Sequence, residues 1–151
     1  MLVPHHALVL VADGRKWMLF RNDGPLDQII LRTESHEERQ DRKDSEIKTD
    51  APGIRGQRFG LARPAMEETN FHQQAEDRFA ADIAAMLTAR VHSGDFEKLI
   101  VIAAPHTLGR LRILWPQDIA ARIVSEIPKD MTNRPTADIE ALLAGEAHPP
   151  G

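Results

Sequence analysis

The chain has 151 residues, which suits one domain with a single hydrophobic core. It contains no cysteine, and this excludes disulfides, thiolate zinc sites and cysteine nucleophiles within the chain. The formal net charge is -4 and no apolar run approaches the roughly 20 residues of a membrane span, so neither a broad nucleic-acid footprint nor a membrane protein is expected.

The N-terminal part of the chain predicts an antiparallel meander. Its first apolar run is uninterrupted, which predicts a strand buried on both faces. Asp13-Gly14 follows that run and is a strong hairpin signal, because both residues tolerate positive φ. A second turn is expected at residues 22–25. The three expected strands cover residues 7–12, 16–21 and 27–32.

Between residues 33 and 69 the apolar pattern disappears. The first part of this segment is charged with mixed sign, and the second part is rich in Gly, Arg and Pro. Such a segment cannot bury enough apolar surface to offset the conformational entropy lost on ordering. We expect a long surface loop, partly mobile, of the kind that is usually functional or disordered in compact domains.

The second half of the chain alternates helical and strand patterns. Asn70 with Gln73 is typical of a capping box at a helix start, and Gly94 is a typical residue just past a helix end. The expected helices cover 71–92, 106–113, 116–121 and 135–144, the expected strands cover 98–104 and 122–127, and a frayed tail covers 145–151. The predicted fold is one α/β domain over residues 1–144, with a mixed five-stranded sheet of order 3-2-1-4-5 and RNase H-like topology.

A turn that carries polar residues follows the strand at 98–104. His106, Arg110 and Arg112 lie just past the carboxyl end of this strand, where α/β proteins commonly bind ligands. With the N–H groups at the start of a helix, these side chains could hold a phosphate or a carboxylate. The alternative is that both arginines are solvated on a short helix whose Leu108 and Leu111 face the core.

Two further sets of polar residues admit a functional and a structural interpretation. His72 and Glu76 could form an acid–base pair, or a structural pair one helical turn apart. Asp13, Glu76 and Asp130 could form the carboxylate cluster of a metal-dependent nuclease. Alternatively, Asp13 and Asp130 are turn or cap residues and Glu76 pairs with His72. The other histidines lack metal-ligand spacing, so neither a metal nor a cofactor is expected, and the sequence favours a binding protein over an enzyme.

Short pieces spread over most of the chain carry a family resemblance. In order they are Ala12-Asp13-Gly14, Phe20-Arg21-Asn22, Glu67, His72, Glu76, Phe79-Ala80, Ala104-Pro105, Leu108-Gly109-Arg110-Leu111-Arg112, Pro128-Lys129-Asp130 and Thr132. Together they resemble the bacterial host attachment protein family, which is named for a proposed role in bacterial attachment to host cells. The resemblance implies a non-enzymatic interaction module.

That family is in turn similar to the middle domain of archaeo-eukaryotic peptide-chain release factors, which carries a Gly-Gly-Gln loop just before its long helix. In this chain Gly56-Gln57 matches the last two positions, whereas Arg55 replaces the first glycine. Backbone flexibility at that position matters in release factors, so the departure argues against peptide release. The resemblance implies, as the alternative function, a translation-associated module that binds ribosome or RNA through Arg55, Gln57, Arg58 and Arg63.

The N-terminus lacks the positively charged start of a signal peptide, so a cytoplasmic location is expected, with surface association left open. Three functions therefore stand at this point: an interaction protein linked to attachment, a module that binds ribosome or RNA, and a metal-dependent nuclease. The partner and the oligomeric state are left open.

Overall fold

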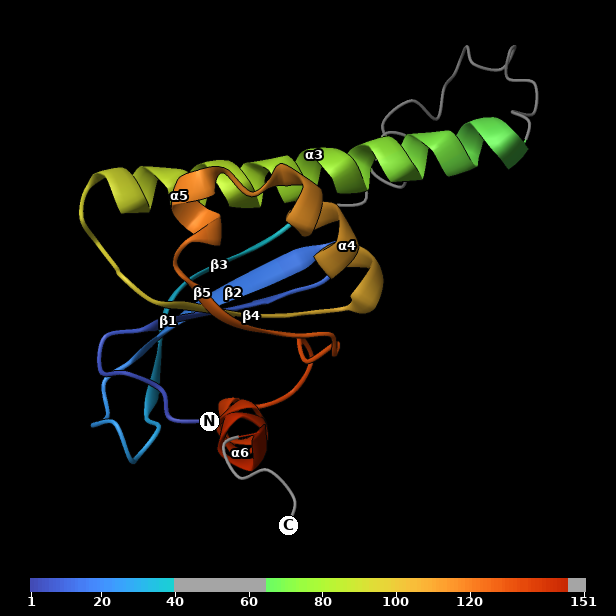
Figure 1. Cartoon of the computed structure of the whole chain (residues 1–151). Helices are drawn as coiled ribbons and strands as arrows, with labels where there is room; N and C mark the ends of the chain where they lie inside the picture. The colour runs from blue at the N-terminus through green and yellow to red at the C-terminus, as the bar shows by residue number, and fades with distance from the viewer. Residues whose placement is uncertain (40–64, 147–151) are drawn as a thin grey trace.

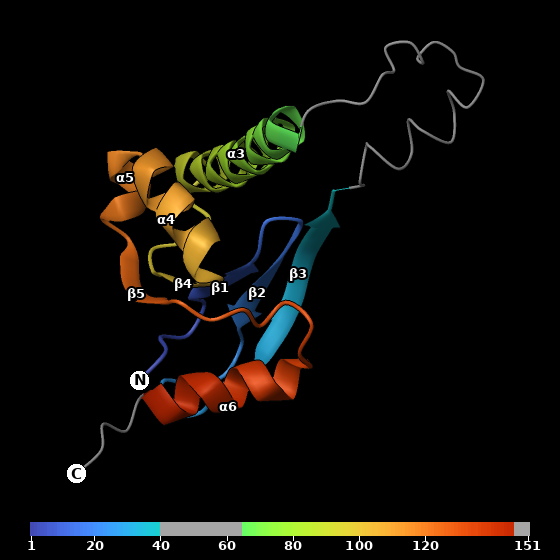
Figure 2. The ribbon, with the colours of Figure 1, turned by 90° about the vertical axis from the view of Figure 1, so that its right-hand side faces the viewer.

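The computed structural model describes residues 1–39 and 65–146. They form a five-stranded sheet of order β3-β2-β1-β4-β5, in which β1 and β4 are parallel neighbours and the hairpin strands are antiparallel. Helices α3, α4 and α5 cover one face of this sheet and α6 covers the other (Figures 1 and 2). The predicted mixed α/β class and strand order are confirmed, and the RNase H-like topology stays a prediction. The elements are β1 (Leu8–Ala12), β2 (Lys16–Asn22), β3 (Leu31–Glu38), α3 (Ala65–His92), β4 (Leu99–Ala103), α4 (Pro105–Leu114), α5 (Gln117–Ala120), β5 (Ile123–Ile127) and α6 (Thr136–Glu146).

The two central strands are buried on both faces, as their uninterrupted apolar runs predict. Every residue of β1 and β4 is buried. Side chains alternate between the faces of a strand, so Leu8 and Leu10 join the core beneath α3 while Val9 and Val11 join the core above α6. The sheet therefore separates two hydrophobic layers.

Helix α3 packs on the sheet through one apolar stripe. Phe79, Ile83, Leu87 and Val91 recur every four residues, so they lie on one face of the helix, and all four are buried. The helix begins at Ala65, so the start predicted at Asn70 is wrong; strong helix formers precede Asn70 in the sequence and extend the helix past that capping signal. Its N-terminal part projects beyond the sheet (Figure 1).

Strand β3 is the largest departure from the predicted elements. A strand was expected over 27–32 and a loop from residue 33, yet β3 runs from Leu31 to Glu38. Most of its side chains are exposed or half-buried, so apolar periodicity could not reveal it. It forms because its backbone pairs with β2, in a register that places Glu38 opposite Lys16. The rest of the predicted loop, residues 40–64, lies outside the described residues.

The last helix also differs slightly from its prediction. Helix α6 runs to Glu146, past the predicted end at residue 144, and residues 147–151 lie outside the described part. Ile139 and Leu143 anchor the helix to the second core layer. Of the helices in residues 1–39 and 65–146, none has the length and apolarity that a membrane crossing needs.

Two glycines provide a matched test of this packing. A Cβ added at Gly24, in the β2–β3 turn, would lie 2.0 Å from the carbonyl oxygen of Gln28, which is backbone and cannot move aside. A Cβ added at Gly109, inside α4, would meet no atom within 4 Å. We expect Gly24→Ala to lower the free energy of unfolding by about 1–3 kcal/mol through overpacking, and Gly109→Ala to raise it by about 0.5–1 kcal/mol through helix propensity. Urea unfolding followed by circular dichroism measures both, and equal effects would contradict the assigned turn.

Candidate functional site

The carboxyl edge of the sheet brings together most of the predicted polar residues. Strands β1 and β4 are parallel and end side by side, with Ala12 opposite Ala103. At this edge β1 turns into the hairpin while β4 continues into α4, so the chain leaves the two strands in opposite directions along the sheet. Ligands commonly bind at such a divergence of neighbouring strands. Helix α4 starts here with Pro105 in its first turn, and the N-cap residue Ala104 provides no side-chain cap.

The predicted anion-binding side chains are held by carboxylates of the chain itself. Arg110 Nη1 lies 3.1 Å from Glu76 Oε1 and its Nε lies 2.5 Å from Asp77 Oδ1. His106 Nε2 lies 3.9 Å from the same Glu76 oxygen. Arg112 turns to β5, where its Nε lies 2.7 Å from Glu126 Oε1. The structure thus gathers His106 and Arg110 around Glu76 but places Arg112 elsewhere.

Glu76 is a contact between α3 and the β1–β2 turn. Its Oε2 would lie 3.0 Å from a Cβ built on Gly14, so a glycine at this position lets the helix approach the turn. Among the described residues no hydrogen bond or ion pair joins Glu76 to His72, whose side chain is exposed. The predicted pairing of these two residues is therefore replaced by a longer-range contact with α4.

Asp13 fastens the β1–β2 turn to the segment that precedes α6. Its Oδ1 accepts hydrogen bonds from the backbone N–H groups of Arg15 and Lys16, at 2.7 and 2.8 Å. Its Oδ2 accepts one at 2.7 Å from the hydroxyl of Thr132, a buried side chain that also lies 2.9 Å from Asp130 Oδ1. Burial raises the pKa of Asp13, but these hydrogen bonds outweigh it and leave the pKa below its ordinary value of 3.8.

The nuclease interpretation gains no support from this geometry. Both carboxylate oxygens of Asp13 accept hydrogen bonds, one from the turn and the other from Thr132, and Glu76 forms an ion pair with Arg110. Within residues 1–39 and 65–146, no three His, Asp or Glu side chains are grouped in a way that could hold a metal ion. The carboxylates Asp13, Glu76 and Asp130 therefore have structural partners, but Glu76 is held by Arg110 and not by His72 as the alternative interpretation expected.

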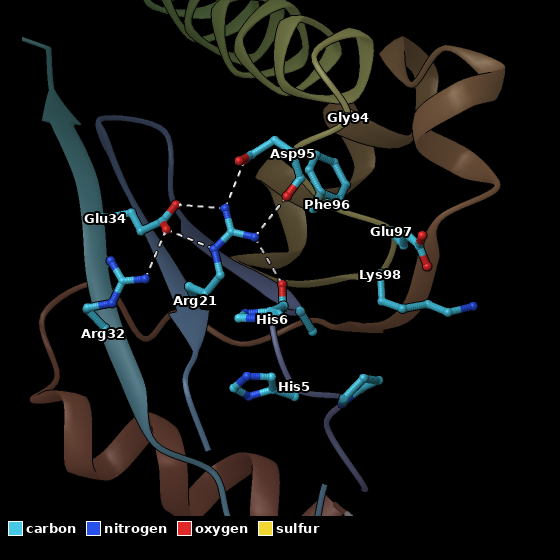
Figure 3. A pocket seen from close by; sticks show the side chains of 12 residues that line it. His5, His6, Arg21, Arg32, Glu34, Gly94, Asp95, Phe96, Glu97 and Lys98 are labelled. Carbon is cyan, nitrogen blue, oxygen red and sulfur yellow. Dashed lines mark hydrogen bonds and ion pairs between the residues drawn. The ribbon is translucent and has the colours of Figure 1, made fainter. Parts of the chain in front are cut away.

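A buried ion-pair network at the opposite, amino edge of the sheet was missed by the sequence predictions. Its centre is Arg21, which is only 7% exposed although it is charged. Figure 3 shows its guanidinium between Glu34 of β3, Asp95 of the α3–β4 connection and the backbone of His6. The available signal was the alternation in β2, because Arg21 continues the buried positions Trp17 and Leu19.

Every N–H group of the Arg21 guanidinium has an acceptor. Nε and Nη2 donate to the two oxygens of Glu34 at 2.8 and 3.2 Å, and Nη2 also donates to Asp95 Oδ2 at 2.9 Å. Nη1 donates to the carbonyl oxygens of His6 and Asp95 at 3.1 and 2.9 Å. A buried charge is tolerated only when its hydrogen bonds are made, and this one makes all five.

Arg90 of α3 completes the network by contacting both acids. Its Nη1 lies 2.9 Å from Glu34 Oε1 and 2.8 Å from Asp95 Oδ2. Arg32 Nη2 also lies 3.4 Å from Glu34 Oε2, so three arginines surround the two carboxylates. The hydrogen bond from Arg21 is the largest influence on Glu34 and lowers its pKa below the ordinary 4.5, and burial opposes this shift only in part. The network joins β2, β3 and the end of α3.

The neighbouring residue Asn22 is fully buried and equally well satisfied. Its Nδ2 donates to the carbonyl oxygens of Val3 and Pro4 at 3.0 and 3.2 Å. Its Oδ1 accepts from the N–H groups of Gly24 and Ile30 at 3.0 and 2.9 Å. One amide therefore fixes the N-terminal segment and the β2–β3 turn, which explains why Arg21-Asn22 ends β2.

The chain folds into a single α/β domain in which a long helix follows a three-stranded meander. This is the arrangement that the resemblance to release-factor middle domains predicts. A family model described as bacterial archaeo-eukaryotic release factor family 12 matches residues 6–143, and the chain belongs to that family. The predicted similarity to release factors is confirmed at this level, whereas the host attachment name is absent from the description of the matching family. No curated protein matches the chain. The predicted contact residues Arg55, Gln57, Arg58 and Arg63 lie outside the described residues.

The Arg21 network predicts a loss of stability in acid. A carboxylate whose pKa is lowered by folding stabilises the fold above its unfolded pKa, and this contribution disappears as the pH falls through the folded pKa. We expect Glu34→Gln to lower the free energy of unfolding by about 3 kcal/mol at neutral pH, because Arg21 stays buried with a weaker partner. The variant should also lose less stability than the wild type between about pH 5 and pH 3.

Asp23→Asn is the matched control for Glu34→Gln. Asp23 pairs at the surface with Arg32, whose side chain is 54% exposed, so this substitution should leave stability nearly unchanged at neutral pH. Chemical unfolding at several pH values measures both variants. A Glu34→Gln variant as stable as Asp23→Asn would show that the network contributes little.

Proposed function

We propose that this protein is a translation-associated module that binds the ribosome or its RNA. The observation that carries the proposal is the match to a bacterial release factor family over residues 6–143, nearly the whole chain. That description supports a translation role over the attachment role, since neither the match nor the geometry points to a host surface.

The sequence that replaces the release-factor loop supplies the cationic contact. Between residues 51 and 64 the chain has three arginines, Arg55, Arg58 and Arg63, and no acidic residue, in a protein of net charge -4. Such a local basic segment suits the phosphate backbone of RNA, to which affinity depends on neutralised phosphates. Arg110 and Arg112 are weaker candidates because carboxylates already neutralise them.

The described residues on either side of residues 40–64, at the end of β3 and the start of α3, support the same proposal. β3 ends beside the β1–β2 turn, where the N–H of Arg39 donates to the carbonyl oxygen of Arg15 at 2.7 Å and its Nε donates to that of Gly14 at 2.8 Å. Helix α3 passes the same turn through Glu76 and starts beyond it, as Figures 1 and 2 show. The carboxyl edge therefore carries both attachment points of the arginine-rich segment.

Co-sedimentation with ribosomes tests the proposal directly. The wild type should sediment with purified bacterial ribosomes at low salt, and an Arg55/Arg58/Arg63→Ala variant should lose most of this binding because three phosphate contacts are removed. An Arg32/Arg78/Arg134→Ala variant has the same change in net charge from exposed arginines of the described surface and should still sediment. Absence of wild-type co-sedimentation, or equal loss in both variants, would refute the proposal.

Binding and peptide release are separable in this chain. Arg55 stands where the release-factor loop has its first glycine, and a residue with a side chain restricts the backbone there. We expect ribosomes carrying formylmethionyl-tRNA to bind the wild type without releasing formylmethionine above the spontaneous rate. Release by the wild type that is lost in Gln57→Ala would contradict this and would identify the protein as an ester hydrolase.

A further inference from the structure

The two outer strands of the sheet, β3 and β5, present different free edges. Among the described residues β3 pairs only with β2, and β5 pairs only with β4. Figure 2 shows them at opposite sides of the sheet. The outer N–H and C=O groups of such a strand can pair with a strand of another chain, unless the side chains around them prevent it.

The free edge of β3 is protected by charge. Arg32, Glu37 and Glu38 are exposed along this strand, and at its start the N–H of Leu31 donates to Glu140 of α6 at 2.8 Å. Charged side chains are a usual means by which an outer strand avoids pairing with another sheet. Two copies of β3 would also bring their glutamates together, so this edge disfavours self-association.

The free edge of β5 lacks this protection. The sequence of the strand is Ile-Val-Ser-Glu-Ile, and its one charged residue, Glu126, is already neutralised, because its Oε1 lies 2.7 Å from Arg112 Nε. Val124 is 49% exposed, and it has no partner on β4 because the register passes from Ile123 to Ser125 at this point. The outer edge of β5 therefore presents neither a proline nor an unpaired charge.

Further apolar side chains are exposed on the neighbouring helix. The ion pair between Arg112 and Glu126 brings the last turn of α4 next to β5. In this turn Ile113 is 84% exposed, more than any other large apolar side chain of the described residues, and Leu114 is exposed as well. Exposed apolar side chains beside a free strand are typical of a surface that contacts another protein chain.

We infer that two copies of this chain associate through β5, which pairs antiparallel with β5 of the second copy across a two-fold axis and joins the two sheets. A strand without unpaired charge is complementary to a copy of itself. When Ser125, the middle residue, lies opposite itself, Glu126 lies opposite Val124 of the partner subunit, so no like charges meet.

The dimer is closed, because only the charged β3 strands remain at its two outer sides. A contact through one short strand and the end of one helix is small, so we expect a dissociation constant in the micromolar range. This inference does not rest on the ribosome proposal, because it uses neither the arginine-rich segment nor the carboxyl edge of the sheet.

Sedimentation equilibrium of the full chain over micromolar to millimolar concentrations tests this interface. The wild type should approach twice the monomer mass of 16.9 kDa. Val124→Lys places two ammonium groups at the paired edge and should weaken dimerisation at least about tenfold. Leu26→Lys is the matched control, since Leu26 is 51% exposed in the β2–β3 turn, and it should dimerise like the wild type. Both variants should keep nearly the melting temperature of the wild type, because both side chains are exposed.

Cross-linking identifies the strand that forms the contact. The chain has no cysteine, so a single introduced cysteine provides the only thiol. Ser125→Cys should give a disulfide-linked dimer under mild oxidation, because the two sulfurs then face each other across the axis. Ser35→Cys, at a half-buried serine of β3, should stay monomeric on a non-reducing gel.

Four results would overturn the inference. The first is a wild type that stays monomeric over the whole concentration range. The second is a Val124→Lys variant that dimerises as well as Leu26→Lys. The third is cross-linking of Ser35→Cys at the rate of Ser125→Cys. The fourth is a mass that rises beyond the dimer, because the charged edge of β3 would then fail to stop growth.

Discussion

The guanidinium of Arg21 lies where four segments of the chain meet, and its five hydrogen bonds hold them in one arrangement. The carboxylates of Glu34 and Asp95 must be present because an unpaired charge in this buried position would be strongly destabilising. Glu34 belongs to β3, a strand with few buried side chains. The ion pair with Arg21 therefore stabilises β3, whereas apolar packing stabilises β1 and β4. The next residue, Asn22, also joins separate segments through hydrogen bonds, in this case with a neutral amide. The N-terminal segment, the hairpin and the end of α3 thus depend on one polar centre.

The two edges of the sheet have different chemistry for this reason. At the carboxyl edge the chain neutralises its own cations, as Arg110 does with Glu76 and Asp77, so a built anion site is absent from the described surface there. What this edge offers is a pair of firm attachment points for the segment that carries Arg55. At the amino edge the charges of the network are paired beneath the surface, while the imidazoles and Lys98 stay exposed around a preformed hollow.

Sequence patterns predicted the elements whose stability is local or apolar. The buried runs of β1 and β4 and the stripe from Phe79 to Val91 report burial directly, so these elements and the sheet order were predicted correctly. Strand β3 was predicted too early and too short because its partners are backbone groups and charges rather than apolar neighbours. Glu34 then fell in a predicted loop, and its pairing with Arg21 could not be foreseen. The side chains past β4 were placed at the correct edge, but their carboxylate partners come from α3 and β5.

By itself the sequence determined the class of fold, the family resemblance and the absence of cysteine chemistry, since each depends on residue identity and spacing along the chain. The tertiary structure decided which charges remain available to a partner. Arg110, Arg112 and Arg21 are all cations in the sequence, yet each is paired with an acid at least 13 positions away. Charge pairing is set by contacts between distant residues, and spacing along the chain does not record it.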